Sequence, residues 1–138
     1  MPKLAPKLAE LPIEIPASPT PEAGATPAPA IDLVHLSRQT LGDHGLEQEL
    51  LGLFARQARD VAARLATPPR ADENKWRADL AHTLKGSAAA VGAGAVARAA
   101  AAYEDAARAG APLETLWPAL NAALAAADAA IEGLLERV

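Results

Sequence analysis

The sequence predicts an all-α protein: an up-down-up-down four-helix bundle with a short additional N-terminal helix. Apolar residues recur every three or four positions through residues 31–138, which is the spacing of amphipathic helices. Alanine, the best helix former, supplies most of the 51% of residues that are hydrophobic. No segment alternates with the period of two that a half-buried strand shows. Short connections between four longer helices make consecutive helices antiparallel neighbours, and this favours a bundle.

Residues 1–30 differ in composition from the rest of the chain. They hold eight of the twelve prolines, which remove backbone donors and block helices. We therefore predict a disordered Pro/Ala-rich tail over residues 1–30 and one helical bundle over residues 31–138. Residues 8–15 are the most apolar part of the tail, and docking of this stretch is the alternative to a fully solvated tail.

The first two helices are expected before Thr67. Apolar residues from Ile31 to Leu41 predict a short helix that ends near Gly42 and covers one end of the bundle. Asp43 is a suitable N-cap for a long second helix, because its side chain accepts a hydrogen bond from a free backbone N–H of the first turn. Thr67 and the two prolines after it end that helix.

An aspartate and three glycines bound the next two helices. Asp72 is the expected N-cap of the third helix, Gly92 and Gly94 mark its end or a break, and the fourth helix ends at Gly110. The last helix begins near Trp117 with Pro118 in its first turn, or it is kinked at Pro118. The third helix is expected to turn an apolar stripe to the core, which consists of Trp76, Leu80, Leu84, Ala88 and Val91.

Composition argues against several classes of protein. A formal net charge of −4 is unlike the basic patch of a nucleic-acid-binding protein. The absence of cysteine rules out disulfides and cysteine zinc sites, and it is consistent with a cytoplasmic location. No run of 18 apolar residues is free of charges, so no membrane span is expected.

One histidine is predicted on the polar side of the third helix. A helix turns by about 100° per residue, so His82 lies about 200° from both Leu80 and Leu84. Because those leucines are expected to face the core, His82 is expected to face water, and a buried core histidine is the weaker alternative. The neighbours expected on the same exposed face are Ala78, Asp79, Lys85, Gly86 and Ala89.

Two of these neighbours suit a histidine that carries a negative group. A glycine inside a helix costs about 0.5–1 kcal/mol relative to alanine, so Gly86 is interpreted as clearance for a partner. The alternatives are a close helix–helix contact and neutral drift. Lys85 is placed to bring its ammonium near a group bound to the ring, and its alternative is an ordinary solvated lysine.

The ring of His82 has the chemistry of a transient carrier. A neutral imidazole nitrogen is nucleophilic near physiological pH and forms covalent intermediates. A metal site is not expected, because zinc takes three or four ligands and the other two histidines, His35 and His44, lie elsewhere along the chain.

Residues 82–88, His-Thr-Leu-Lys-Gly-Ser-Ala, resemble the His-x-Leu-Lys-Gly-Ser-Ser/Ala signature of histidine-containing phosphotransfer (HPt) domains. Gly92 is similar to a glycine of that family ten residues after the histidine, and Tyr103 with Glu104 resembles its apolar-then-Glu/Gln pair. The resemblance extends over residues 31–138 and implies the HPt bundle. Ala88 replaces the second serine of the commonest form of the motif.

The resemblance implies a phosphorelay carrier. His82 would accept a phosphoryl group at Nε2 from the aspartyl phosphate of a receiver domain and pass it to a response-regulator receiver. Lys85 would support the phosphoryl group, Gly86 would leave room for the receiver, and Glu104 would orient the imidazole or be a solvated carboxylate. The partners would be receiver domains of hybrid histidine kinases and response regulators, and their acidic pocket would hold the Mg²⁺. Ala78, Asp79 and Ala89 are then candidate partner contacts.

Two other functions stay open at this point. One is a helical adaptor that binds receiver domains without being phosphorylated, and the other is a dimerising scaffold, although we expect a monomer. The chain shows no Gly-x-x-x-x-Gly-Lys loop and is too short for a kinase domain, so neither autokinase activity nor a cofactor of its own is expected. The sequence names neither the upstream kinase nor the downstream regulator, and it does not set the direction of phosphoryl flow.

Overall fold

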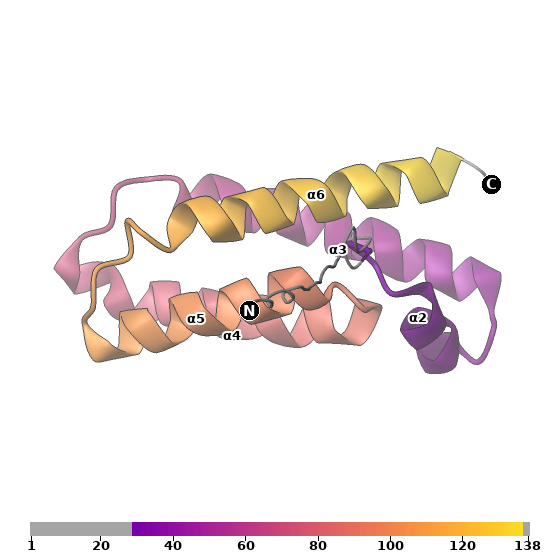
Figure 1. Cartoon of the computed structure of the whole chain (residues 1–138), viewed down its shortest axis with the longest axis horizontal. Coiled ribbons are helices and arrows are strands. Elements are labelled where there is room, and N and C mark those ends of the chain that lie inside the picture. The colour runs from indigo at the N-terminus through magenta and orange to yellow at the C-terminus, as the bar shows by residue number, and fades with distance from the viewer. Residues whose placement is uncertain (1–28, 137–138) are drawn as a thin grey trace, which may run out of the picture.

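A computed structural model describes residues 29–136, and within that range the chain forms five α-helices and no strand (Figure 1). The predicted tail over residues 1–30 therefore lies almost wholly outside the described residues. The helices and one 3-10 turn are α2 (Leu33–Thr40), α3 (His44–Leu65), η3 (Ala71–Glu73), α4 (Asn74–Val91), α5 (Gly94–Ala109) and α6 (Trp117–Glu136). The all-α prediction is confirmed.

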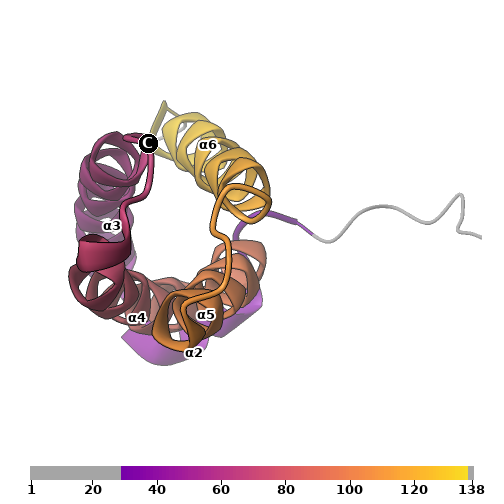
Figure 2. The ribbon, with the colours of Figure 1, turned by 90° about the vertical axis from the view of Figure 1, so that its left-hand side faces the viewer.

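Helices α3, α4, α5 and α6 surround one core (Figure 2). Each of these helices contacts the next along the chain, and α6 returns to contact α3, which closes the bundle. The core between them is built from leucine, valine, isoleucine, one phenylalanine, one tyrosine and many alanines. Helix α2 packs against α3 and α4 at one end of the bundle, as predicted.

Most helix termini lie where the capping residues predict them. The Asp43 side chain accepts a hydrogen bond from the backbone N–H of Leu46 and begins α3. Helices α4 and α5 end at Gly92 and Gly110, which both adopt the left-handed conformation. Helix α6 begins at Trp117 with Pro118 in its first turn, which settles the alternative in favour of an unkinked start.

Asp72 does not cap the third helix. It lies inside the 3-10 turn η3, and α4 begins only at Asn74. Glu73 precedes α4 without capping it: its side chain accepts a hydrogen bond from the backbone N–H of Arg70, at 3.3 Å, at the start of the 3-10 turn.

The apolar stripe predicted for α4 is rotated from the face that the helix buries. Leu84, Ala88 and Val91 are buried, but Trp76 is 39% exposed and Leu80 is only partly buried. The buried face also includes Ala78 and Ala81, both without exposed surface. Small alanine side chains let α4 approach its neighbours closely, which makes this face the core face despite its low hydrophobicity.

A buried arginine joins three elements near the start of α4. Arg77 has no exposed surface, and its guanidinium bonds to the Glu73 carboxylate at 2.9 Å and to the Tyr103 hydroxyl at 3.1 Å. It also donates to the backbone oxygens of Leu65 and Thr67, at 3.4 and 3.0 Å. These bonds satisfy carbonyl groups at the open C-terminal end of α3, so a charge is tolerated where the pattern predicts only apolar side chains.

Among the described residues, α6 is the one helix long and apolar enough to cross a membrane by length and composition. In this fold it forms one wall of the bundle: Leu120, Leu124 and Ile131 are buried, and Asp128 pairs with Arg59 of α3 at 2.9 Å. The expectation of no membrane span stays a prediction.

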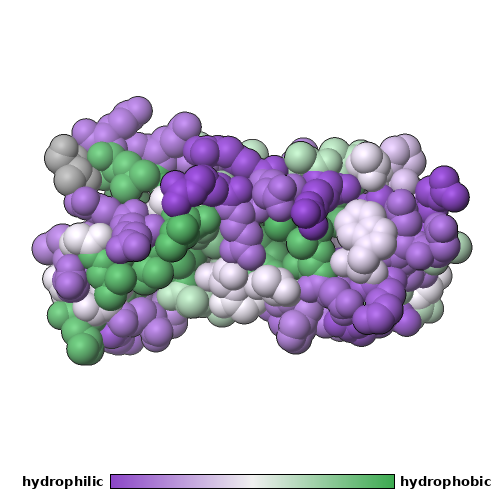
Figure 3. Space-filling model, turned by 180° about the vertical axis from the view of Figure 1, so that it is seen from behind, coloured by the Kyte–Doolittle hydropathy of each residue, from purple (hydrophilic) through white to green (hydrophobic). Residues whose placement is uncertain are grey.

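Exposed apolar side chains gather at the end of the bundle where α2 packs, as the space-filling view shows (Figure 3). Leu33 and Val34 of α2 are 51% and 62% exposed, and Leu41 just after that helix is 93% exposed. At the same end, Leu46 in the first turn of α3 is 40% exposed.

Candidate functional site

His82 lies in the middle of α4 and points away from the core. Its side chain is 61% exposed, whereas Ala81 and Leu84 beside it have no exposed surface. The prediction that His82 faces water is confirmed, and the alternative of a buried core histidine is wrong.

The His82 ring is held from the neighbouring helix. Its Nδ1 lies 3.0 Å from Oε2 of Glu104 on α5, and the Glu104 side chain is only 8% exposed. An ionised carboxylate accepts the hydrogen bond, so this contact favours the tautomer with its proton on Nδ1. The lone pair is then on Nε2, the ring nitrogen that the contact leaves available to a partner.

Two cations share the Glu104 carboxylate with His82. Lys85 donates to Oε1 from Nζ at 3.0 Å, and Arg108 donates to Oε2 from Nε at 3.0 Å. Lys85 is therefore not an ordinary solvated lysine: it lies 38% exposed, one turn after His82, and is ion-paired across the α4–α5 seam. Glu104 is likewise no solvated carboxylate.

These donors keep Glu104 ionised. The hydrogen bond from Lys85 is the largest cause that lowers its pKa, and the hydrogen bond from Arg108 and the nearby His82 add to it. Partial burial acts in the opposite direction, yet the pKa falls to about 2. The imidazole of His82 therefore faces a carboxylate charge at any physiological pH.

Asp79 lies one turn before His82, and its carboxylate is paired with two cations. Its Oδ2 bonds to Lys75 at 2.9 Å, and its Oδ1 receives Nη2 of Arg108 at 3.3 Å. The hydrogen bond from Lys75 is the largest cause that lowers its pKa, with a further contribution from Arg108. The cations near the ring are Lys75, Lys85 and Arg108, and the carboxylates are Asp79 and Glu104. These side chains around a neutral His82 therefore carry one net positive charge.

Gly86 is exposed, and there is room beside it for a side chain. A Cβ built at this position meets no heavy atom within 4 Å. A close helix–helix contact therefore does not explain this glycine, and open space lies one turn beyond the imidazole.

The structure separates the three predicted partner contacts. Ala78 is fully buried, so its expected place on the exposed face is wrong: the rotation of the core face of α4 turns it inward. Asp79 is half-exposed, and Ala89 is exposed two turns beyond His82 on the same side of α4.

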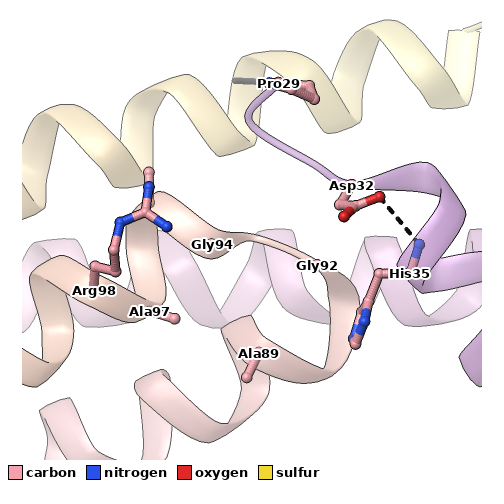
Figure 4. A pocket seen from close by; sticks show the side chains of 9 residues that line it. Pro29, Asp32, His35, Ala89, Gly92, Gly94, Ala97 and Arg98 are labelled. Carbon is pink, nitrogen blue, oxygen red and sulfur yellow. Dashed lines mark hydrogen bonds between the residues drawn. The ribbon is translucent and has the colours of Figure 1, made fainter. Parts of the chain in front are cut away.

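Ala89 lines a cavity of about 610 Å³ between α2 and the α4–α5 turn (Figure 4). Asp32, His35 and Arg98 also line it. The Asp32 carboxylate accepts the backbone N–H of His35 at 3.1 Å, while Nε2 of His35 is buried with no hydrogen-bond partner.

Arg108 is the site residue that the sequence reasoning missed. It lies four residues after Glu104, on the same face of α5, and a cation at that spacing from a glutamate is a recognisable helix pair. Its contact with Asp79 depends on how α4 and α5 are aligned, which no pattern within one helix shows.

No group of three His, Asp or Glu side chains suited to a metal ion occurs in residues 29–136. Residues 49–137, from within α3 onward, match a family model described as the Hpt domain. Comparison with curated proteins and with solved structures gives no significant match.

Proposed function

Because the chain belongs to the Hpt domain family, which acts in histidine phosphotransfer within phosphorelays, we propose that it is a phosphocarrier that uses His82. In this proposal His82 takes a phosphoryl group from the aspartyl phosphate of one receiver domain and gives it to the aspartate of another. The observation that carries it is the pairing of His82 with Glu104: Nδ1 is bound, Nε2 is available, and the side chain is 61% exposed.

The transfer step follows from this geometry. The Nε2 lone pair attacks phosphorus, the bond from phosphorus to the receiver's carboxylate oxygen breaks, and the carboxylate leaves with the electron pair. The ring then holds the phosphoryl group on Nε2, a proton on Nδ1 and a positive charge, which the Glu104 carboxylate offsets. Transfer to the second receiver is the same step in reverse.

Lys85 and Gly86 support the same step. The phosphoryl group brings about two negative charges. The Lys85 ammonium, which is ion-paired with the Glu104 carboxylate beside the ring, can turn toward that group. Gly86 leaves open space beside the ring for the receiver's active site. The Mg²⁺ for transfer would belong to the receiver, so the carrier itself needs no cofactor. We further propose a cytoplasmic monomer without autokinase activity.

Phosphate labelling tests the proposal. A receiver domain carrying a labelled aspartyl phosphate should transfer label to the wild-type chain, and His82→Gln should receive none. His44→Gln is the matched control, because His44 is also an exposed histidine at 88% but lies on α3. Label that never reaches the chain would make it a non-phosphorylated adaptor instead. Label that reaches His82→Gln equally would mean that another residue is phosphorylated, and the role of His82 would be wrong.

A further inference from the structure

Four charged or polar side chains form a rectangle across the seam between α4 and α5. Asp79 and His82 are one turn apart on α4, and Glu104 and Arg108 are one turn apart on α5. His82 meets Glu104 at 3.0 Å, and Asp79 meets Arg108 at 3.3 Å. Arg108 also bonds to Glu104 on its own helix, so it links the two contacts that cross the seam.

Arg108 contacts the same carboxylate oxygen as the imidazole. Its Nε and Nη2 lie 3.0 and 2.9 Å from Oε2 of Glu104, the atom that also accepts from Nδ1 of His82. An arginine fork has fixed geometry, so its position determines where that oxygen lies. Arg108 itself is 47% exposed, and a long exposed side chain needs a second anchor to stay in one rotamer.

Asp79 is that second anchor. Its carboxylate receives Nη2 of Arg108 from the opposite helix and so fixes the end of the fork. Lys75 sits on the other oxygen of Asp79 at 2.9 Å, which leaves Asp79 ionised and directed along the helix surface. The negative charge of Asp79 is therefore paired with two cations of this chain, Lys75 and Arg108.

We propose that Asp79 and Arg108 are positioning residues, which together hold the Glu104 carboxylate against Nδ1 of His82 and so keep Nε2 as the nucleophile. This inference rests on the proposed function, because it concerns the same transfer step. It gives Asp79 a role inside the protein in addition to any contact with a partner. Neither residue touches the phosphoryl group in this role.

The tautomer of His82 is a direct readout of this role. In the unphosphorylated full chain, ¹⁵N NMR of the imidazole should show the proton mainly on Nδ1. Asp79→Asn and Arg108→Gln should each shift the population toward the Nε2-protonated form. Arg108→Lys, which keeps the charge without the fork, should restore only part of the wild-type signal.

Phosphotransfer rates provide the second readout. Asp79→Asn should slow transfer about two- to fivefold, the size expected for one half-exposed ion pair, and Arg108→Gln should slow it about tenfold. The double variant should be no slower than Arg108→Gln, because both residues act through Glu104. Arg98→Gln, which removes an exposed arginine from the same helix, is the control and should leave tautomer and rate unchanged.

The outcomes separate this inference from the proposed function. If Asp79→Asn and Arg108→Gln keep the tautomer and the rate of Arg98→Gln, the positioning role is wrong even though transfer occurs. If the wild-type chain accepts no label, the proposed function fails, but the tautomer shift still decides whether the two residues position His82. Unchanged helical circular dichroism in each variant shows that the fold is retained.

Discussion

Arg77 and Glu104 are both buried charged residues of the same helix pair, but different kinds of hydrogen-bond partner surround them. The guanidinium of Arg77 is fully enclosed, and backbone carbonyls at the end of α3 are among its partners. Among residues 29–136, the partners of the Glu104 carboxylate are side chains that are at least 38% exposed: His82, Lys85 and Arg108. Backbone partners are fixed by the fold, whereas the side-chain partners of Glu104 lie at the surface, where another protein can reach them.

The difference suggests how a bundle separates stability from function. Around Arg77 each donor has an acceptor that the fold holds in place, so this region stabilises the junction of α3, α4 and α5. Around Glu104 the cations lie beside the His82 imidazole and outnumber the carboxylates by one, a charge that would attract an anion from outside. Stability and transfer should therefore change independently when the two regions are varied.

The largest effect on stability is expected at Arg77. Arg77→Ala leaves the Tyr103 hydroxyl and backbone carbonyls without partners and opens a cavity, so the free energy of unfolding should fall by about 3 kcal/mol. Urea unfolding followed by circular dichroism measures this. Arg59→Ala removes a surface pair with Asp128 and should lower it far less, because exposed ion pairs contribute little to stability. Equal losses in the two variants would contradict the comparison, as would a slower transfer by folded Arg77→Ala.

Gly86 should respond with opposite signs for stability and transfer. Gly86→Ala adds a Cβ that meets nothing in the protein, so the helix should gain about 0.5–1 kcal/mol. Gly86→Leu should stay folded yet slow transfer at least about tenfold, because its side chain fills the space beside the imidazole.

Gly133 of α6 is the matched control, since a Cβ there also meets nothing within 4 Å. Gly133→Leu should leave the transfer rate unchanged. If Gly86→Leu transfers phosphate at the wild-type rate, Gly86 is not clearance for the receiver.

The smallest effect concerns the pH dependence of stability. Glu104 has a pKa of about 2 in the folded chain against 4.5 as its ordinary value, so unfolding takes up a proton between these two pH values. Its contribution to stability is complete above about pH 4.5 and is lost as the pH falls toward 2. Glu104→Gln should therefore flatten the fall in unfolding free energy over that window.

The size of this change is limited because the partners of Glu104 are solvent-exposed. Glu114→Gln, at an exposed carboxylate before α6, is the control and should keep the wild-type slope. Identical slopes for Glu104→Gln and the wild type would show that the ion pairs of Glu104 do not stabilise the fold.

Much of the fold could be predicted from local signals. The caps at Asp43, Gly92 and Gly110 mark helix ends because each residue satisfies or relieves the backbone of its own turn. The exposure of His82 followed from the helical period alone. The core face of α4 was predicted less well. Trp76 has the larger apolar side chain, yet Ala78 is the buried residue, because the small alanine fits the narrow space between helices.

Contacts between helices were beyond prediction for a different reason. The burial of Arg77 depends on open carbonyls at the end of another helix, and the pairing of Asp79 with Arg108 depends on how α4 and α5 are aligned. Neither condition is written in the spacing of residues along one helix. The family resemblance placed Glu104 near His82, but the shared use of its carboxylate required the structure.

The short turn between α4 and α5 has a consequence for folding. The backbone N–H of Asp32 donates to the oxygen of Gly92 at 2.8 Å. A Cβ on Gly92 would meet the Asp32 backbone at 2.7 Å, so the segment before α2 packs closely against this turn. Only residues 92 and 93 separate the two helices, and the ion pairs of His82, Lys85, Asp79 and Arg108 join residues of this α4–α5 hairpin. Loop closure for so local a unit is fast, whereas α3 and α6 must meet across a long stretch of chain. We therefore expect the α4–α5 hairpin, which carries His82, to fold first and the remaining helices to pack against it.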